Sequence, residues 1–61
     1  MNREQIQTRI NSLIQDLRIN HLPRVAEGLQ KGYVDENQIL VMYDHAVRIR
    51  VLQEYLNHTG V

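Results

Sequence analysis

The C-terminal segment, residues 36–57, most constrains the fold because it is apolar around most of its circumference when drawn as a helix. Its apolar side chains cluster on one side in the first half and on nearly the opposite side in the second half. Such a helix is normally covered by more than one neighbour, and the shorter segments before it cannot cover it on all sides. We therefore expect a second copy of the chain, or another protein, to contact it. The predicted interface residues are Ile39, Met42, Tyr43, Val47, Val51, Leu52, Tyr55 and Leu56.

A β-hairpin is the competing interpretation of residues 39–51. Residues 47–51 read Val, Arg, Ile, Arg, Val, an alternation typical of a strand, and residues 39–43 could pair with them. The connecting residues 44–46 contain no Gly and no Asn-Gly turn, which argues against a hairpin. The sequence favours a helix here and leaves the hairpin open.

The N-terminal segment, residues 3–18, has the spacing of an amphipathic helix. Its apolar residues recur every three or four positions and form one stripe about 100° wide. The same spacing would suit a short coiled-coil seam. The stripe consists of Ile6, Ile10, Leu13, Ile14 and Leu17.

A break in the helix is expected at residues 19–23, because Pro23 has no amide hydrogen and disfavours a helical conformation in the residue before it. A short helix should follow over residues 22–31, and Gly32 should end it. Asp35 is then well placed to cap the C-terminal helix. The chain is thus expected to contain two to three helices with short connections.

The predicted fold class is all-α, with two to three helices in a hairpin-like unit and residues 1–61 forming a single small domain. In a chain of 7.2 kDa, burial of apolar surface and the conformational entropy lost on folding are each about 90 kcal/mol and nearly cancel. The sequence contains no Cys, so neither a disulfide nor a zinc–thiolate site can add stability. We therefore expect a homodimeric helical bundle.

No catalytic residue, metal site or cofactor is expected. The only Ser is Ser12, on the polar side of the first helix, and the histidines lie in different segments with no two of them four residues apart. These histidines are His21, His45 and His58. A calcium loop centred on Gly32 would require Leu29 and Lys31 as ligands, and neither side chain can coordinate Ca²⁺. The sequence predicts a protein that is not an enzyme and has no small-molecule substrate.

The expected function is that of a small interaction or regulatory protein that self-associates and presents a helical surface to a protein partner. The alternative is a regulator of transcription, replication or mobile elements that contacts DNA or RNA through Arg residues of the first helix, although the net charge is zero. The candidate contacts are Arg3, Arg9, Arg18 and Arg24. The longest apolar run, residues 39–43, is far short of a membrane span, and residues 1–5 lack the apolar core of a signal peptide. A cytoplasmic location without membrane contact is expected.

Overall fold

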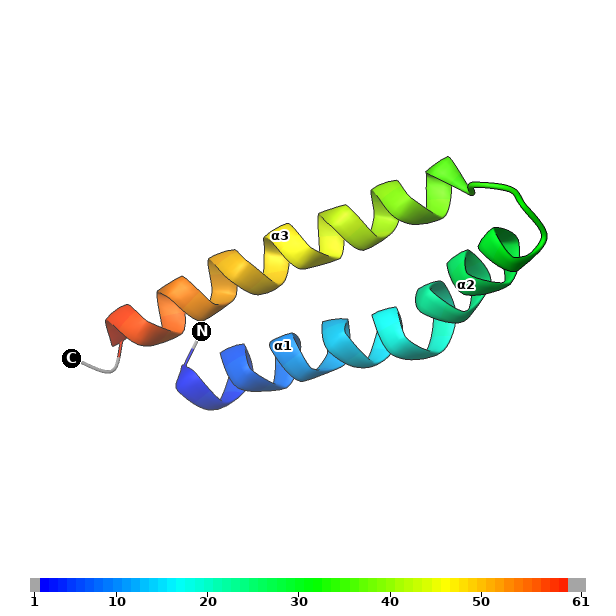
Figure 1. Ribbon diagram of the computed structural model, residues 1–61. Coiled ribbons are helices and arrows are strands. Elements are labelled where there is room, and N and C mark those ends of the chain that lie inside the picture. The colour runs from blue at the N-terminus through cyan, green and yellow to red at the C-terminus, as the bar shows by residue number, and fades with distance from the viewer. Residues whose placement is uncertain (1, 60–61) are drawn as a thin grey trace.

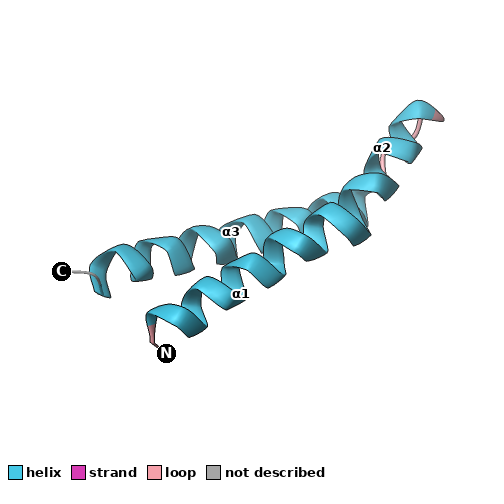
Figure 2. Cartoon of the chain, turned by 90° about the horizontal axis from the view of Figure 1, so that it is seen from below, coloured by secondary structure: helices cyan, strands magenta, loops and turns pink. Residues whose placement is uncertain are grey.

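The computed structural model describes residues 2–59, which form a helical hairpin (Figure 1). The two arms lie side by side and run in opposite directions, and the hairpin measures 47 × 16 × 13 Å. Figure 2 shows the α2 end turning away from the line of α1. The first arm contains α1 (Arg3–Asp16), a π-helical turn η1 (Leu17–His21) and α2 (Leu22–Gln30), and the second arm is α3 (Glu36–Thr59).

All regular structure in the described part of the chain is helical, so the predicted all-α class is confirmed. The β-hairpin alternative for residues 39–51 is wrong, because all of these residues lie in α3. Ion pairs four residues apart support this helix: Asp44–Arg48 has an N–O distance of 2.9 Å and Glu54–Arg50 one of 3.4 Å. Among the helices described, none combines the length and the apolar character that crossing a membrane requires.

α1 begins at a reciprocal cap. The Asn2 side chain accepts a hydrogen bond of 2.8 Å from the Gln5 amide, and the Gln5 side chain accepts one of 3.1 Å from the Asn2 amide. Beyond this cap the apolar stripe of α1 packs against α3. The buried large apolar residues of the described chain are Ile6, Ile10 and Leu13, and of these Ile6 is fully buried. The core is therefore a single thin layer of side chains between two helices.

The expected break at residues 19–23 is wrong, because the first arm stays helical through them, as η1 and then as the start of α2. The amide of Leu22 donates to the carbonyl of Leu17, five residues back instead of four. Pro23 is the local cause, since it has no N–H to donate to the preceding turn and the helical hydrogen bonds must rearrange around it. The chain accommodates Pro23 by placing one extra residue in the helix.

The extra residue in η1 keeps the first arm in register with α3. After Leu17 the inward positions shift by one residue, so that His21 is half-buried and Asn20 is exposed. Without the shift, inward positions that alternate by three and four residues would place Asn20, three residues after Leu17, towards α3. On α3 the inward positions alternate by four and three residues without interruption, which is the spacing of coiled coils. We call these positions the seam: Ile6, Ile10, Leu13, Leu17, His21, Val25 and Gly28 on the first arm, and Gln38, Met42, His45, Ile49, Leu52 and Leu56 on α3.

The turn between the arms has the hydrogen bonds of a Schellman motif, which confirms the predicted helix end. Gly32 has a φ of +82°, a conformation that favours glycine. Its amide donates to the carbonyl of Leu29 at 3.1 Å, and the amide of Tyr33 donates to the carbonyl of Gly28 at 2.9 Å. Asp35 then caps α3, as predicted, by accepting a hydrogen bond of 3.1 Å from an amide in the first turn.

Replacing Ile6 with Ala should lower the free energy of unfolding by about 2–5 kcal/mol, because the side chain is fully buried and its loss leaves a cavity. The matched control is Ile19→Ala, which removes the same atoms from a side chain that is 62% exposed and should cost less than about 1 kcal/mol. Urea denaturation followed by circular dichroism measures both values. Equal losses would contradict the position of the core.

Candidate functional site

Two imidazoles converge on one carboxylate oxygen where η1 meets α3. The Nε2 atoms of His21 and His45 lie 2.9 and 2.7 Å from Oδ2 of Asp16. The two rings meet edge to face, with centroids 5.2 Å apart and an interplanar angle of 70°. Asp16 and His21 belong to the first arm and His45 to the second, so the group joins the arms. We call these three residues the Asp–His cluster.

The π-helical turn is the reason that Asp16 and His21 lie together. Residues five apart in an α-helix are rotated by about 500°, so their side chains would point about 140° apart. The extra residue of η1 restores the relation of residues four apart, which are neighbours on a helix surface. His45 faces them because it lies seven residues after Gln38, two turns along the seam of α3.

Two amide side chains contact the cluster from outside. Nδ2 of Asn20 lies 2.5 Å from Oδ1 of Asp16, and Oε1 of Gln38 lies 2.7 Å from Nδ1 of His21. Nδ1 of His45 is buried and has no hydrogen-bond partner among the described residues. The His21 and His45 side chains are 16% and 15% exposed and that of Asp16 is 36% exposed, so the cluster is half-buried.

These contacts determine the charges of the cluster. Hydrogen bonds from Asn20, then from His45 and His21, lower the pKa of Asp16 to about 2. The Gln38 oxygen, and after it the Asp16 carboxylate, raises the pKa of His21, although partial burial acts in the opposite direction. A carboxylate only accepts hydrogen bonds, so both Nε2 atoms carry hydrogens. Nδ1 of His21 faces an oxygen as well, and this contact favours the protonated ring, in keeping with the raised pKa of His21.

The sequence alone did not predict this cluster. The histidines appeared to lie in separate segments, and the spacing of Asp16 and His21, five residues, is not one that places side chains together on an α-helix. One feature of the sequence could have indicated the cluster. The inward positions of the first arm continue from Leu17 to Val25 only if the helix contains one extra residue before Pro23. The third histidine of the sequence, which is exposed near the end of α3, is not part of the cluster.

The predicted interface residues fall into two groups. Met42, Leu52 and Leu56 are half-buried and belong to the seam, so the first arm already covers much of their surface. The others are exposed large apolar side chains: Ile39, Tyr43, Val47, Val51 and Tyr55. Leu40 joins them with an exposed fraction of 64%. We define the outer stripe, on the side of α3 opposite the seam, as Leu40, Tyr43, Val47, Val51 and Tyr55.

An apolar groove lies between the arms beside the outer stripe. It has a volume of about 360 Å³, and α1 contributes Leu13 to it. Arg9 and Arg48 also line the groove, where their aliphatic stems add apolar surface. Its α3 side is formed by Val47, Val51 and Leu52. The exposed valines of α3 therefore continue into a concave surface.

The four arginines predicted to contact nucleic acid do not share one surface. Arg3 donates a hydrogen bond of 3.1 Å to the carbonyl of Leu56 near the open end of the hairpin. Arg9 lines the apolar groove, and Arg24 lines a different hollow at the other end, near the turn. Arg18 is exposed on η1. This dispersion does not form the continuous basic face that binding to phosphates favours.

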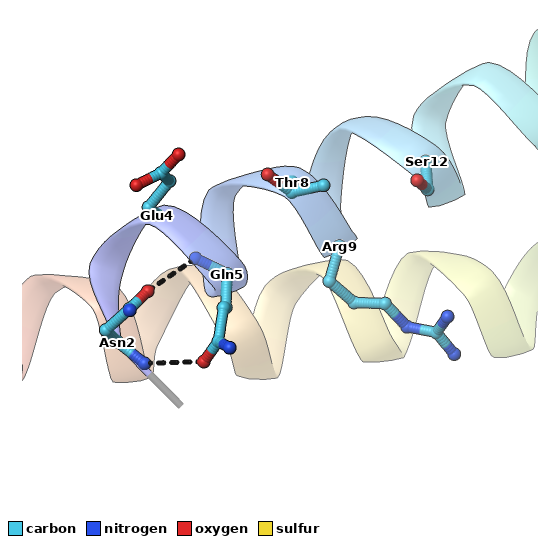
Figure 3. Close-up of a pocket in the computed structure, with 6 residues that line it drawn as sticks. All are labelled: Asn2, Glu4, Gln5, Thr8, Arg9 and Ser12. Atoms are coloured by element: carbon cyan, nitrogen blue, oxygen red, sulfur yellow. Dashed lines mark hydrogen bonds between the residues drawn. The ribbon is translucent and has the colours of Figure 1, made fainter.

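The outer side of α1 near its beginning is a shallow polar hollow of about 520 Å³ (Figure 3). Its acidic and basic side chains do not meet, because Arg9 extends away from Glu4 and from the capping pair. The residues that line it are Asn2, Glu4, Gln5, Thr8, Arg9 and Ser12. These side chains are hydrogen-bonding groups, and none of them is a histidine.

We expect the hairpin to be most stable between about pH 4 and pH 6.5. The lowered pKa of Asp16 stabilises the fold above the ordinary value of 3.8, and this contribution is lost as the pH falls towards about 2. The raised pKa of His21 stabilises the fold below the ordinary value of 6.5, and this contribution is lost as the pH rises through the raised value. Thermal unfolding from pH 2 to pH 9 measures the profile.

Matched variants separate the two sides of this profile. Asp16→Asn should flatten the acid side, and His21→Gln should flatten the side above pH 6.5. His58→Gln, which removes a histidine outside the cluster, should leave the profile unchanged. A profile with the same shape in all three variants would show that the cluster does not govern stability.

Searches against protein-family models, curated proteins and solved structures found no match for this chain. Two features of the hairpin therefore stand on their own geometry: the outer stripe with its groove, and the Asp–His cluster that joins the arms.

Proposed function

We propose that this chain is a non-enzymatic helical interaction module that self-associates through the outer stripe of α3 and the adjoining groove. The occupant of this surface is a second copy of the same chain. Two hairpins paired in this way form a helical bundle in which the two α3 helices pack against each other and cover each other's exposed side. The outer side of α1 stays free in such a bundle, and it is the surface offered to a protein partner.

The main support for this proposal is that the chain exposes more surface than a compact monomer of its mass. The chain has an accessible surface of 4893 Å². A compact monomer of 7.2 kDa exposes about 4,100 Å². The excess, about 800 Å², equals what each partner contributes to a protein interface of standard size. A second copy would remove this excess from water.

The composition of the surface also supports a protein occupant. The outer stripe contains two tyrosines, Tyr43 and Tyr55, which are 70% and 54% exposed, and tyrosine is enriched among residues that dominate interface energies. Val47 and Val51 link the stripe to the groove, so one partner helix can contact both. An exposed apolar surface of this extent is unusual in a protein that acts as a monomer.

Charge does not oppose the pairing of identical copies. The formal net charge is zero, so two chains do not repel each other at long range. The charged residues that flank the stripe are already paired within α3, as Asp44 with Arg48 and Glu54 with Arg50. A two-fold symmetric interface requires a surface that complements itself, and a neutral apolar stripe meets this condition.

The nucleic-acid alternative receives no comparable support. Its four arginines lie on different parts of the hairpin, and one of them already donates to a backbone carbonyl. The observations favour contact with protein.

Val51→Asp should abolish self-association, because it places an unpaired charge on the outer stripe at the edge of the groove. Helicity should fall as well, since folding is linked to association. Sedimentation velocity at two protein concentrations, together with circular dichroism, measures both effects.

The matched control is Gln53→Asp. It adds the same charge two residues further on, about 160° around α3 from Val51, at an exposed position outside the stripe and groove. This variant should associate like the unmodified chain. A Val51→Asp variant that sediments as the unmodified chain does, or an unmodified chain that stays monomeric at both concentrations, would contradict the proposal.

A further inference from the structure

We propose that the Asp–His cluster is a binding site for one divalent transition-metal ion, with Zn²⁺ as the best fit. The ligands are Nε2 of His21, Nε2 of His45 and Oδ2 of Asp16. The site lies within a single chain, so it does not depend on self-association.

The three donor atoms already converge. Both Nε2 atoms lie within 2.9 Å of Oδ2 of Asp16, and the candidate ligand atoms all lie within 4.8 Å of one another. Ligands of a tetrahedral Zn²⁺ at about 2.05 Å are about 3.3 Å apart. Binding therefore requires the two N–O pairs to open by about 0.5 Å and the two Nε2 atoms to lie about 3.3 Å apart, while the metal replaces the two Nε2 hydrogens. Side-chain rotations provide such a movement without a change in the helices.

The contacts outside the cluster are an independent indication. A histidine that binds a metal generally donates its other ring N–H to an oxygen, and Nδ1 of His21 lies 2.7 Å from Oε1 of Gln38. A carboxylate ligand is generally hydrogen-bonded in turn, and Oδ1 of Asp16 accepts from Asn20. Neither contact uses a proposed donor atom, so both persist when the metal binds. They hold the first-arm ligands in the orientation that the metal requires.

The ligand types identify the class of ion. Two imidazoles and one carboxylate suit Zn²⁺ and its neighbours in the first transition row, whereas Ca²⁺ and Mg²⁺ require oxygen ligands. Three protein ligands leave one tetrahedral position free. Asp16 and His45 line a surface hollow of about 390 Å³, through which water or a small anion can reach that position. Arg9 and Arg48 line the same hollow, where Arg48 is paired with Asp44.

The ion would fasten the two arms together. Asp16 and His21 lie at the end of α1 and in η1, and His45 lies near the middle of α3. A ligand that binds only the folded hairpin stabilises it in proportion to its concentration and affinity. The expected effect is a rise in melting temperature that depends on the concentration of Zn²⁺.

The test is thermal unfolding of the full chain with and without ZnCl₂, followed by circular dichroism. Zn²⁺ at about one hundred times its dissociation constant should raise the melting temperature by about 20 °C. His45→Gln should abolish the shift, and His58→Gln, which removes the exposed histidine outside the cluster, should keep it in full. An equal shift in both variants, or none in the unmodified chain, would overturn the proposal.

A measurement on the unmodified chain covers the case in which His45→Gln does not fold. Addition of Zn²⁺ should move the imidazole ¹⁵N resonances of His21 and His45 and saturate at one ion per chain, while those of His58 stay in place. Co²⁺ should give the intense visible absorption of a tetrahedral complex. Shifts confined to His58, or saturation without any change at His21 and His45, would refute the site.

Discussion

The one-residue expansion at η1 is the constraint on which the rest of the hairpin depends. Pro23 removes a backbone donor, and the helix responds with a hydrogen bond from Leu22 to Leu17 in place of a break. This response keeps a single long arm, which can pack along most of α3. It also moves the later seam positions by one residue, so that His21 faces α3 and Asn20 does not. Both the packing of the arms and the Asp–His cluster follow from this local event.

The cluster places a polar layer in a seam that is otherwise largely apolar. Buried polar groups are costly unless they are hydrogen-bonded, and Asp16, Gln38 and the two imidazoles largely satisfy one another. A polar layer of this kind restricts the registers in which two helices can pack. The buried apolar side chains Ile6, Ile10 and Leu13 lie to one side of this layer, in α1. The core is thin and the outer stripe is exposed for the same reason: only one helical arm packs against α3.

Much of the fold could be predicted from local patterns. The stripe of α1, the helix end at Gly32 and the cap at Asp35 depend on residues close together in sequence, and each has a known conformational preference. The candidate site could not be predicted in this way. His21 and His45 are 24 positions apart, and Asp16 joins them only because of a helix type that spacing rules for α-helices do not include. Pro23 was interpreted as the cause of a break in the helix, whereas the helix continues with one extra residue.

The sequence by itself favoured a helical chain, placed apolar residues on more than one side of residues 36–57, and determined that no thiol is present for a metal or a disulfide. These properties follow from the residue types and from the spacing of apolar residues over less than two helical turns. Only the tertiary structure decided which apolar side chains the first arm covers, and that two histidines and an aspartate from both arms share one point. The physical reason is that the rotation of the first arm relative to α3 depends on the hydrogen bonds of η1, and side-chain spacing along the chain does not contain that angle.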